Sequence, residues 1–381
     1  MAVLFRVCVG LILYTYMLYP LLVVAWARLF PRHTQTDESI LPSVSMVIAA
    51  YNEETVIEQK LKNCLTIDYP ADRIESVFGS DGSTDRTNKI LSACGDARVR
   101  SFLYREREGK LNVLNKIVPQ TRGDILVFSD ANTIYRPDAV RKLVRHFADP
   151  TVGGVCGQLR LVAPDDNASG KGEGLYWRYE NVLKMAEGAI YTVIGANGAI
   201  YAIRREHFRA LPVETVIMDD FLIPLRIVEQ RRRMIYEPEA VATENASPDI
   251  RGEFTRKVRI AAANFNAIPH ILGLLNPSRG FVALVLWSHK IVRWSVPFLA
   301  MGALVTNLLV LRSGWIYVVT LGLQLLVYVG AILGYLGDCL FGRPGPFMPF
   351  YYLVTMNLAM VLGFWRSLVH TQEIAWERVQ H

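Results

Sequence analysis

Long apolar segments occur at both ends of the chain, and the segment between them is soluble in composition. Residues 3–30 form an apolar run that is long enough to cross a bilayer, which requires about 20 residues in a helix. No small-residue cleavage site follows this run, so we interpret residues 1–32 as an uncleaved anchor rather than a signal peptide. Three further apolar stretches, at roughly 294–311, 315–337 and 347–369, predict membrane helices.

Short apolar runs in the middle segment, about 43–250, alternate with helix-type patterns. The runs predicted to be strands are Val44–Ala50, Ile74–Phe78, Val99–Tyr104 and Gly123–Phe128. Helices are predicted over Glu53–Leu65, from about Asp85, over Leu111–Val118, and after Arg136-Pro137-Asp138, where Pro stands near a first turn. This alternation is typical of βαβ units, so we predict an α/β domain with a mostly parallel sheet.

Composition and charge bear mainly on the choice of partners. Of the 381 residues, 51% are hydrophobic and 20% are charged, so the two classes must be segregated along the chain. The formal charge of +6 and the isoelectric point near 9.0 fit contact with anionic lipid headgroups and phosphates. A merely basic soluble surface fits the charge equally well. The five cysteines lie far apart, which indicates neither a disulfide framework nor a zinc site.

Basic residues beside the first apolar run predict its orientation. Lys and Arg close to a spanning helix tend to stay in the cytoplasm. Arg28 and Arg32 flank one end of the run, whereas Arg6 stands alone at the other. The middle segment is therefore predicted to be cytoplasmic.

Four acidic signatures follow one another along the middle segment: Tyr51-Asn52-Glu53, Ser80-Asp81-Gly82-Ser83-Thr84-Asp85, Asp130-Ala131-Asn132 and Asp219-Asp220. Each of the first three follows a predicted strand, so their side chains are expected at the carboxyl ends of neighbouring parallel strands. That edge is where open α/β sheets bind ligands. Together the signatures predict a pocket for a nucleoside diphosphate.

The first three signatures offer oxygen atoms with different uses. Glu53 and Asp81 are suited to accept hydrogen bonds from a nucleobase and a ribose. Asp81 equally suits a turn or a helix cap, because Asp-Gly-Ser-Thr-Asp is also good turn chemistry. Asp130 and Asn132 are spaced as oxygen ligands for a hard divalent cation that also holds phosphate oxygens. Their alternative reading is an Asx turn before the next helix.

Two further motifs bear on phosphate binding and proton transfer. Lys110 follows Arg107-Glu108-Gly109 and opens a helix-like run, a place where backbone amides also favour anions; a solvated basic loop is the alternative. Asp219 and Asp220 precede an apolar stretch, and burial raises a carboxylate pKa toward the range of a general base. A helix N-cap is the alternative for this pair.

In this order, the motifs make residues 43–260 similar to the membrane-bound family-2 glycosyltransferases of the GT-A fold. That group includes bacterial exopolysaccharide glycosyltransferases and the cellulose, chitin and hyaluronan synthases. The resemblance implies a GT-A (Rossmann-like) catalytic domain and an inverting transfer from a nucleoside diphosphate sugar, most often a UDP-sugar. It also implies Mg or Mn bridging the diphosphate.

The resemblance further implies roles for individual residues. The donor would be bound by Ala50, Tyr51, Asn52, Glu53, Asp81, Lys110, Arg256 and Arg259, and the metal by Asp130 and Asn132. Asp220 matches the last residue of the family's Thr-Glu-Asp motif, so it would deprotonate the acceptor hydroxyl, with Asp219 as the nearby alternative. Gly195-Ala196-Asn197-Gly198 matches the segment that lines the acceptor site, where glycines let the backbone approach a sugar closely.

Two departures from the family pattern concern the product and the metal. Where polymerising synthases carry Gln-x-x-Arg-Trp, this chain has Arg256-Lys257-Val258-Arg259-Ile260 and no aromatic platform for the acceptor sugar. A gating-loop motif is also missing, so the case for a processive synthase is weakened. Arg256 and Arg259 would instead add positive charge beside the leaving diphosphate. The amide of Asn132 replaces a carboxylate.

The segment after the middle domain mixes basic and apolar residues. Residues 251–275 resemble an amphipathic helix on a membrane surface; a helix packed in the soluble core is the alternative. Residues 281–293 fit either a second interfacial helix or the start of a span, so 251–293 is predicted to be interfacial and 294–369 membrane-spanning. Three spans would place the tail at 370–381 outside, whereas Arg366 and Arg378 indicate inside. One segment is therefore miscounted, or the tail is an exception.

These observations predict an enzyme embedded in a membrane, in bacteria the inner membrane, that faces the cytoplasm. It would extend a lipid-linked or membrane-proximal glycan by one or a few sugars. The alternative within the same class is a processive polysaccharide synthase with a translocation channel, and outside it a nucleotide-sensing membrane protein without turnover. The expected partners are a nucleotide sugar, a glycan acceptor and membrane lipids, and no nucleic acid.

Overall fold

The computed structural model describes residues 1–162, 168–245, 250–341, 345–369 and 371. They fall into two compact units. One lies within residues 26–163 and 178–246 and is called the sheet unit. The other lies within residues 1–25, 164–177 and 247–372 and is called the helical unit. Each is described by itself.

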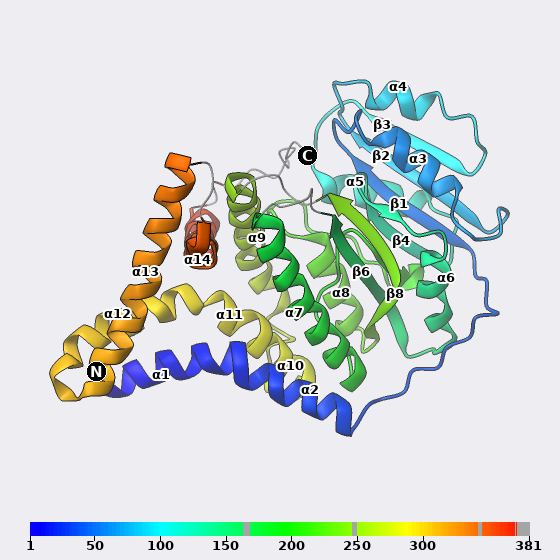
Figure 1. Ribbon diagram of the computed structural model, residues 1–381. Helices are drawn as coiled ribbons and strands as arrows, with labels where there is room; N and C mark the ends of the chain where they lie inside the picture. Colours follow the sequence, from blue (N-terminus) through cyan, green and yellow to red (C-terminus); the bar gives the residue numbers. More distant parts are fainter. Residues whose placement is uncertain (163–167, 246–249, 342–344, 370, 372–381) are drawn as a thin grey trace. The chain divides into compact units, whose positions relative to one another are not determined.

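The sheet unit is built on one mixed sheet (Figure 1). Its eight described strands are β1 (Val44–Ala50), β2 (Ile74–Asp81), β3 (Val99–Tyr104), β4 (Ile125–Asp130), β5 (Ile134–Tyr135), β6 (Val152–Val162), β7 (Tyr201–Arg204) and β8 (Arg233–Asn245). They lie in the order β3-β2-β1-β4-β7-β6-β8-β5. Strands β3, β2, β1 and β4 run parallel to one another, and β6 runs parallel to β8. Strand β7 runs antiparallel to both β4 and β6, and β5 runs antiparallel to β8. The predicted α/β domain with a mostly parallel sheet is confirmed.

Helices cover both faces of this sheet, which explains why every residue of the central strand β1 is buried and why most of its residues are apolar. The described helices of the unit are α3 (Ile57–Leu65), α4 (Thr87–Ser92), α5 (Lys110–Ile117), α6 (Ala139–Val144), α8 (Asp219–Glu229) and the second half of α7 (Ala168–Ile190), with 3₁₀ turns at Val118–Gln120, Arg145–Ala148 and Arg205–His207. Met46 and Ile48 of β1 share a buried cluster with Ile57 of α3. On the other face, Gly79 of β2 lies against Val113 of α5, where a Cβ atom would meet the valine at 2.4 Å.

Several element ends differ from the sequence prediction. Strands β2 and β4 continue to Asp81 and Asp130, so both acids are the last residues of their strands. The helix predicted from Glu53 begins only at Ile57, because the residues before it form a loop tied to the loop after β2. The backbone N–H of Asn52, for example, donates to Ser83 Oγ at 3.1 Å. The two loops therefore fix one another at the carboxyl ends of β1 and β2.

The helical unit contains the apolar segments. Its described elements are α1 (Ala2–Leu13), a π turn (Tyr14–Leu18), the start of α2 (Tyr19–Leu29), the first part of α7, α9 (Ile250–Ile271), α10 (Phe281–Val285), a π turn (Leu286–Ile291), α11 (Val292–Trp294), α12 (Val296–Val310), α13 (Trp315–Phe341) and α14 (Met348–Leu368), with 3₁₀ turns at Pro277–Arg279, Leu311–Ser313 and Gly345–Phe347. Four described segments are long and apolar enough to cross a membrane: Ala2–Leu29, Val296–Ser313, Trp315–Phe341 and Gly345–Leu368. These match the four predicted spans.

Helix α9 packs closely on α14 within this unit. At Gly363 of α14, a Cβ atom would come within 2.4 Å of the Ala261 side chain of α9. The rings of Phe265 and Phe364 meet edge to face with centroids 4.9 Å apart. The predicted amphipathic segment therefore packs against an apolar helix of its own unit, and its place on a membrane surface stays a prediction.

Candidate functional site

A lysine joins two of the predicted acids at the carboxyl edge of the sheet. Lys110 is the first residue of α5, Asp130 is the last of β4 and Asp219 is the first of α8. The Lys110 ammonium group lies 2.8 Å from Asp130 Oδ1 and 3.1 Å from Asp219 Oδ1. Burial alone would lower the pKa of Lys110, but the two carboxylates raise it overall, so the lysine stays charged. Three residues that are distant in sequence thus form one ion-pair cluster.

Asp220 lies beside this cluster in an unusual electrostatic setting. Desolvation of its half-buried carboxyl, followed by the charge of Asp219, raises the pKa of Asp220 to about 7, while Lys110 and Lys184 oppose the rise. The backbone N–H of Gly198 donates to Asp220 Oδ2 at 3.1 Å. A carboxylate with a pKa near neutrality can take up a proton during a reaction and release it afterwards.

The predicted acceptor segment, Gly195 to Gly198, lies directly against Asp220. Gly195 has a φ of +93°, which favours glycine. The backbone N–H of Ala196 donates to the carbonyl oxygen of Asp220 at 2.7 Å. Asn197 is buried, and its Nδ2 atom donates to the carbonyl oxygen of Gly157 at 2.6 Å. The segment and the Asp220 carboxyl are therefore held in one arrangement.

For the general-base role predicted for Asp220, replacing Gly198 with alanine is expected to lower turnover several-fold, because the carboxyl must move by a few tenths of an ångström and a misplacement of about 1 Å can cost roughly 100-fold. The added Cβ atom would lie 3.0 Å from Asp220 Oδ2 and 3.4 Å from Asp220 Cγ, so the carboxyl must shift. Gly95→Ala is the matched control, since a Cβ atom there meets nothing within 4 Å. Steady-state kinetics and melting temperatures of both variants check this. Equal turnover in the two would contradict it.

The predicted nucleoside-binding residues lie at the ends of β1 and β2. Asp81 is fully buried, and its two oxygens accept hydrogen bonds from the backbone N–H groups of Glu108 at 2.7 Å and Gly109 at 2.9 Å. Asp81 thus fixes the loop that presents Lys110. The other predicted nucleoside-binding residues are Ala50, Tyr51, Asn52 and Glu53, and Ala50 is the last residue of β1. The Arg107 guanidinium carbon lies 3.9 Å from the centre of the Tyr51 ring, and Asn52 has a φ of +54°. Their roles toward a nucleoside stay predictions.

Asn132 is hydrogen-bonded to the carboxylate of Glu244, a residue that was not predicted from the sequence. Its Nδ2 atom donates to Glu244 Oε1 on β8 at 3.0 Å. This hydrogen bond orients the amide so that Oδ1 is directed away from Glu244. No sequence pattern pointed to Glu244, because 112 positions separate the two residues.

Lys60 was also missed, although its position offered a signal. It falls on the apolar face of α3 with Ile57 and Cys64, and it is fully buried. Its ammonium group donates to Ser129 Oγ at 2.6 Å and to the Thr133 carbonyl oxygen at 2.7 Å. These two residues immediately flank Asp130-Ala131-Asn132, so the hydrogen bonds of Lys60 hold both ends of that segment in place.

The donor set at this edge fits a hard divalent cation. Asp130, Asn132 and Glu244 offer carboxylate and amide oxygens, the ligands that Mg²⁺ and Mn²⁺ prefer. Within the described part of the chain, no group of three or more His, Cys, Asp or Glu residues is placed to hold a metal by itself. A cation here would therefore need oxygens from a bound diphosphate to complete its coordination.

Arg256 and Arg259, which are predicted to bind the nucleotide sugar, belong to the helical unit. Arg256 lies on α9 with its Nε atom 2.8 Å from Glu253 Oε2, and Lys257 lies 3.3 Å from Glu253 Oε1. Arg259 follows on the same helix. The contact of Arg256 and Arg259 with a diphosphate stays a prediction.

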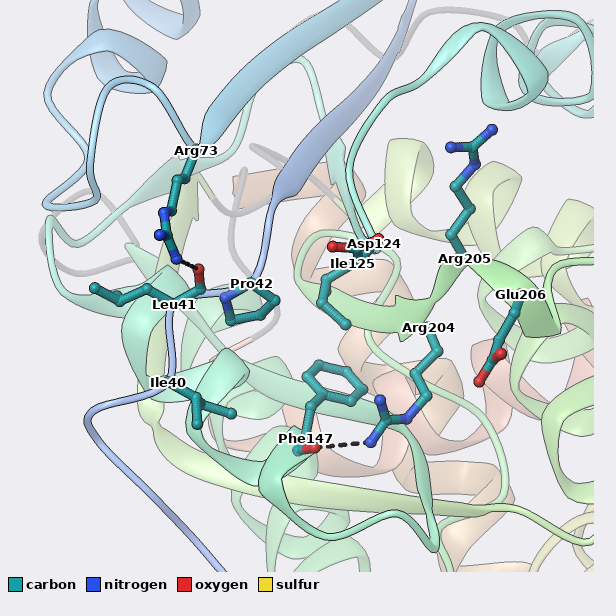
Figure 2. Close-up of a pocket in the computed structure, with 10 residues that line it drawn as sticks. All are labelled: Ile40, Leu41, Pro42, Arg73, Asp124, Ile125, Phe147, Arg204, Arg205 and Glu206. Carbon is teal, nitrogen blue, oxygen red and sulfur yellow. Dashed lines mark hydrogen bonds between the residues drawn. The ribbon is translucent and has the colours of Figure 1, made fainter.

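A separate pocket of about 780 Å³ opens at the other edge of the sheet (Figure 2). It adjoins Ile125, the first residue of β4, and Arg204, the last residue of the antiparallel β7. Figure 2 shows Arg204 donating to the carbonyl oxygen of Phe147, at 2.7 Å, and Arg73 donating to that of Leu41, at 2.6 Å. None of the predicted site residues lines this pocket. The acids gather at the carboxyl edge instead, as open α/β sheets require.

Comparison with known proteins agrees with this geometry. Residues 45–211 match the protein family described as glycosyl transferase family 2. The chain is 37% identical over 116 residues to a beta-monoglucosyldiacylglycerol synthase of Synechocystis sp., covering 29% of this chain and 24% of the relative. It is 25% identical over 229 residues to a poly-beta-1,6-N-acetyl-D-glucosamine synthase of Staphylococcus aureus, covering 58% of this chain and 54% of that protein. The chain thus spans about a quarter and about half of these relatives.

One solved structure resembles nearly the whole chain. It is the mannosyltransferase PcManGT from Pyrobaculum calidifontis, in complex with GDP-Man and Mn²⁺. The match covers 97% of this chain and 100% of that one, with a TM-score of 0.72 and 23% sequence identity. At this identity the likeness establishes the GT-A fold.

Proposed function

We propose that this chain, which carries a glycosyl transferase family 2 domain, transfers a sugar from a nucleoside diphosphate sugar to an acceptor hydroxyl group with inversion at the anomeric carbon. The observation that carries the proposal is Asp220, whose pKa is raised to about 7 beside the Gly195 to Gly198 segment and the cluster of Lys110, Asp130 and Asp219. The residues predicted to act as the base, to line the acceptor site and to bind phosphate lie together there.

The proposed reaction uses Asp220 as the general base. Its carboxylate takes the proton of the acceptor hydroxyl while that oxygen forms a bond to the anomeric carbon. The bond between this carbon and the diphosphate oxygen breaks at the same time, and the nucleoside diphosphate leaves with the electron pair. The hydrogen bond from the Gly198 N–H group holds the carboxyl in position for the proton.

The residues at the end of β4 would hold the cation that the family implies. Asp130 supplies one negative charge, and Asn132, oriented by Glu244, supplies an amide oxygen. A divalent cation bound there would neutralise charge on the diphosphate as it leaves. The Mn²⁺ in the PcManGT complex supports this choice of ion class, with Mg²⁺ as the alternative. Lys110 keeps Asp130 and Asp219 paired before the donor binds.

We infer a UDP-sugar donor and a lipid-linked or membrane-proximal acceptor. One relative is named as a glycolipid synthase, and four helical segments of this chain are apolar enough to cross a membrane. Arg28 and Arg32 favour a cytoplasmic sheet unit, in bacteria at the inner membrane. The sequence at 256–260 lacks the Trp of polymerising synthases, which favours addition of one or a few sugars.

A processive polysaccharide synthase is the second candidate, because the poly-N-acetylglucosamine synthase matches 58% of this chain. Membranes containing the chain, incubated with radiolabelled UDP-sugars and Mn²⁺, separate the two candidates. Short products that extract into organic solvent support the first, and long insoluble polymer supports the second. Nucleotide binding without any transfer from a full panel of donors would indicate the non-catalytic alternative.

Turnover should depend on pH through Asp220. Because its carboxyl must be deprotonated to accept a proton and its pKa lies at about 7, kcat is expected to be low below pH 6 and to rise to a plateau above pH 8. In Asp219→Asn, removing a charge that raises the Asp220 pKa should move the midpoint to lower pH. Rate profiles of both proteins check this, and an unmoved midpoint would contradict the assignment.

A further inference from the structure

A buried lysine of α7 lies directly beneath the acceptor segment. The Lys184 side chain is 5% exposed, and its ammonium group donates to Asn197 Oδ1. Asn197 in turn donates to the Gly157 carbonyl oxygen at 2.6 Å, and its backbone N–H donates to Cys156 Sγ at 3.2 Å. Lys184 is therefore bound to a residue in the middle of the segment.

Through this segment, Lys184 is connected to the proposed base. Asn197 precedes Gly198, whose backbone N–H donates to Asp220 Oδ2 at 3.1 Å. On the other side, Ala196 donates to the carbonyl oxygen of Asp220 at 2.7 Å. Movement of Asn197 would thus change both hydrogen bonds that tie the segment to Asp220.

Burying the charged ammonium group of Lys184 costs free energy, which its contacts in the protein must offset. Burying an ammonium group removes its hydration, so a buried lysine is retained only where polar or charged neighbours compensate. The amide oxygen of Asn197 is one such neighbour. The charge of Lys184 also acts on Asp220, lowering its pKa against the opposite effects of Asp219 and Asp130.

We propose that Lys184 is a positioning residue for sugar transfer: it fixes Asn197 and thereby sets the place of the Gly198 N–H group and of the Asp220 carboxyl. The proposal rests on the transferase function proposed above. Lys184 acts through the protein segment and does not itself contact the donor or the metal. Its loss should therefore damage turnover while leaving donor binding intact.

Lys60 offers a matched comparison within the same unit. It too is a buried lysine, but it braces the residues that flank Asp130-Ala131-Asn132. Lys60→Met should therefore weaken Mn²⁺-dependent binding of UDP, whereas Lys184→Met should not. If only Lys60→Met loses UDP affinity, each lysine positions its own segment. If both variants lose UDP affinity, the protein needs its buried lysines for packing in general.

The test uses the full chain in detergent. In Lys184→Met, kcat should fall by roughly 100-fold, the size of effect expected from a displaced catalytic group. The Mn²⁺-dependent affinity for UDP, measured by calorimetry, should be unchanged. Amide hydrogen exchange should become faster in residues 195–198 and stay unchanged in β4. Lys184→Gln, which keeps an N–H donor without the charge, should regain part of the lost kcat.

Three results would overturn the proposal. The first is full kcat in Lys184→Met, and the second is unchanged exchange in residues 195–198. The third is loss of UDP affinity together with faster exchange throughout the sheet unit, since that pattern indicates general packing. If the wild-type chain transfers no sugar from any donor, the proposed function fails, but the exchange comparison still decides whether Lys184 fixes the segment.

Discussion

Asp220→Asn is expected to lower kcat by about 10²–10⁴-fold, the contribution that a positioned general base makes to catalysis. Asparagine keeps the shape of the side chain and can still accept the hydrogen bond from Gly198, but it cannot take up a proton. Binding of UDP with Mn²⁺ should persist, so the loss should appear in kcat rather than in donor affinity. Steady-state kinetics and calorimetry measure the two quantities separately.

Asp124→Asn is the matched control for this variant. Asp124 lines the pocket at the opposite edge of the sheet, where its Oδ2 atom accepts a hydrogen bond from Ser43 at 2.6 Å, and its replacement should leave kcat unchanged. Wild-type turnover in Asp220→Asn would remove Asp220 from the proposed mechanism. A membrane protein that only senses nucleotides would instead show no sugar transfer in either protein and unchanged nucleotide binding in Asp220→Asn.

Asp220→Asn should also change how the stability of the protein depends on pH. The pKa of Asp220 rises from its ordinary 3.8 to about 7 in the folded protein, so the folded state binds more protons than the unfolded state between these values. The free energy of unfolding therefore falls as pH rises through this window. Asp220→Asn lacks this titrating group, so its stability should not fall in this way. The melting temperature of Asp220→Asn minus that of the wild type should therefore be larger at pH 8 than at pH 5. An equal difference at both pH values would contradict the raised pKa.

Asp130→Asn is expected to abolish the stabilisation that UDP and Mn²⁺ together confer, and to lower turnover by about a thousandfold. Asp130 provides the formal negative charge of the Asp130-Ala131-Asn132 segment, and without it the segment offers only neutral amide oxygens, which leaves Glu244 as the remaining carboxylate of the donor set. The Lys110 ammonium group would also lose its partner at 2.8 Å. Thermal shifts with UDP, with Mn²⁺ and with both ligands check the prediction, because ligand-linked stabilisation reports affinity directly.

Asp138→Asn serves as the control for the metal-site variant. Asp138 forms an exposed ion pair with Arg136 at 3.2 Å, and exposed pairs contribute little to stability. It should retain the full shift with UDP and Mn²⁺. A wild-type shift in Asp130→Asn as well would place the cation elsewhere.

Much of the sheet and its binding edge could be predicted from local patterns. Apolar runs bounded by polar loops indicated β1, β2, β3 and β4. The runs were clearest for β1, β2 and β4, because these strands are buried along most of their length and such strands favour apolar residues, whereas β3 is only partly buried. The acids at the ends of β2 and β4 then had to share an edge, since parallel strands point the same way. The less regular ends, such as the loop from Glu53 to Val56, depend on contacts with another loop and were missed.

The alternation of strands and helices, the apolar helical segments and the order of Asp81, Asp130 and Asp220 could all be read from the chain without coordinates. Only the folded protein shows which side chains support these acids. Glu244 reaches Asn132 across 112 positions, and Lys60 reaches Ser129 across 69. Such pairs leave no periodic signal, because a hydrogen bond between distant elements depends on how those elements pack and not on their spacing. Asp81 shows the same limit, since only the folded loop reveals that both its oxygens hold backbone N–H groups.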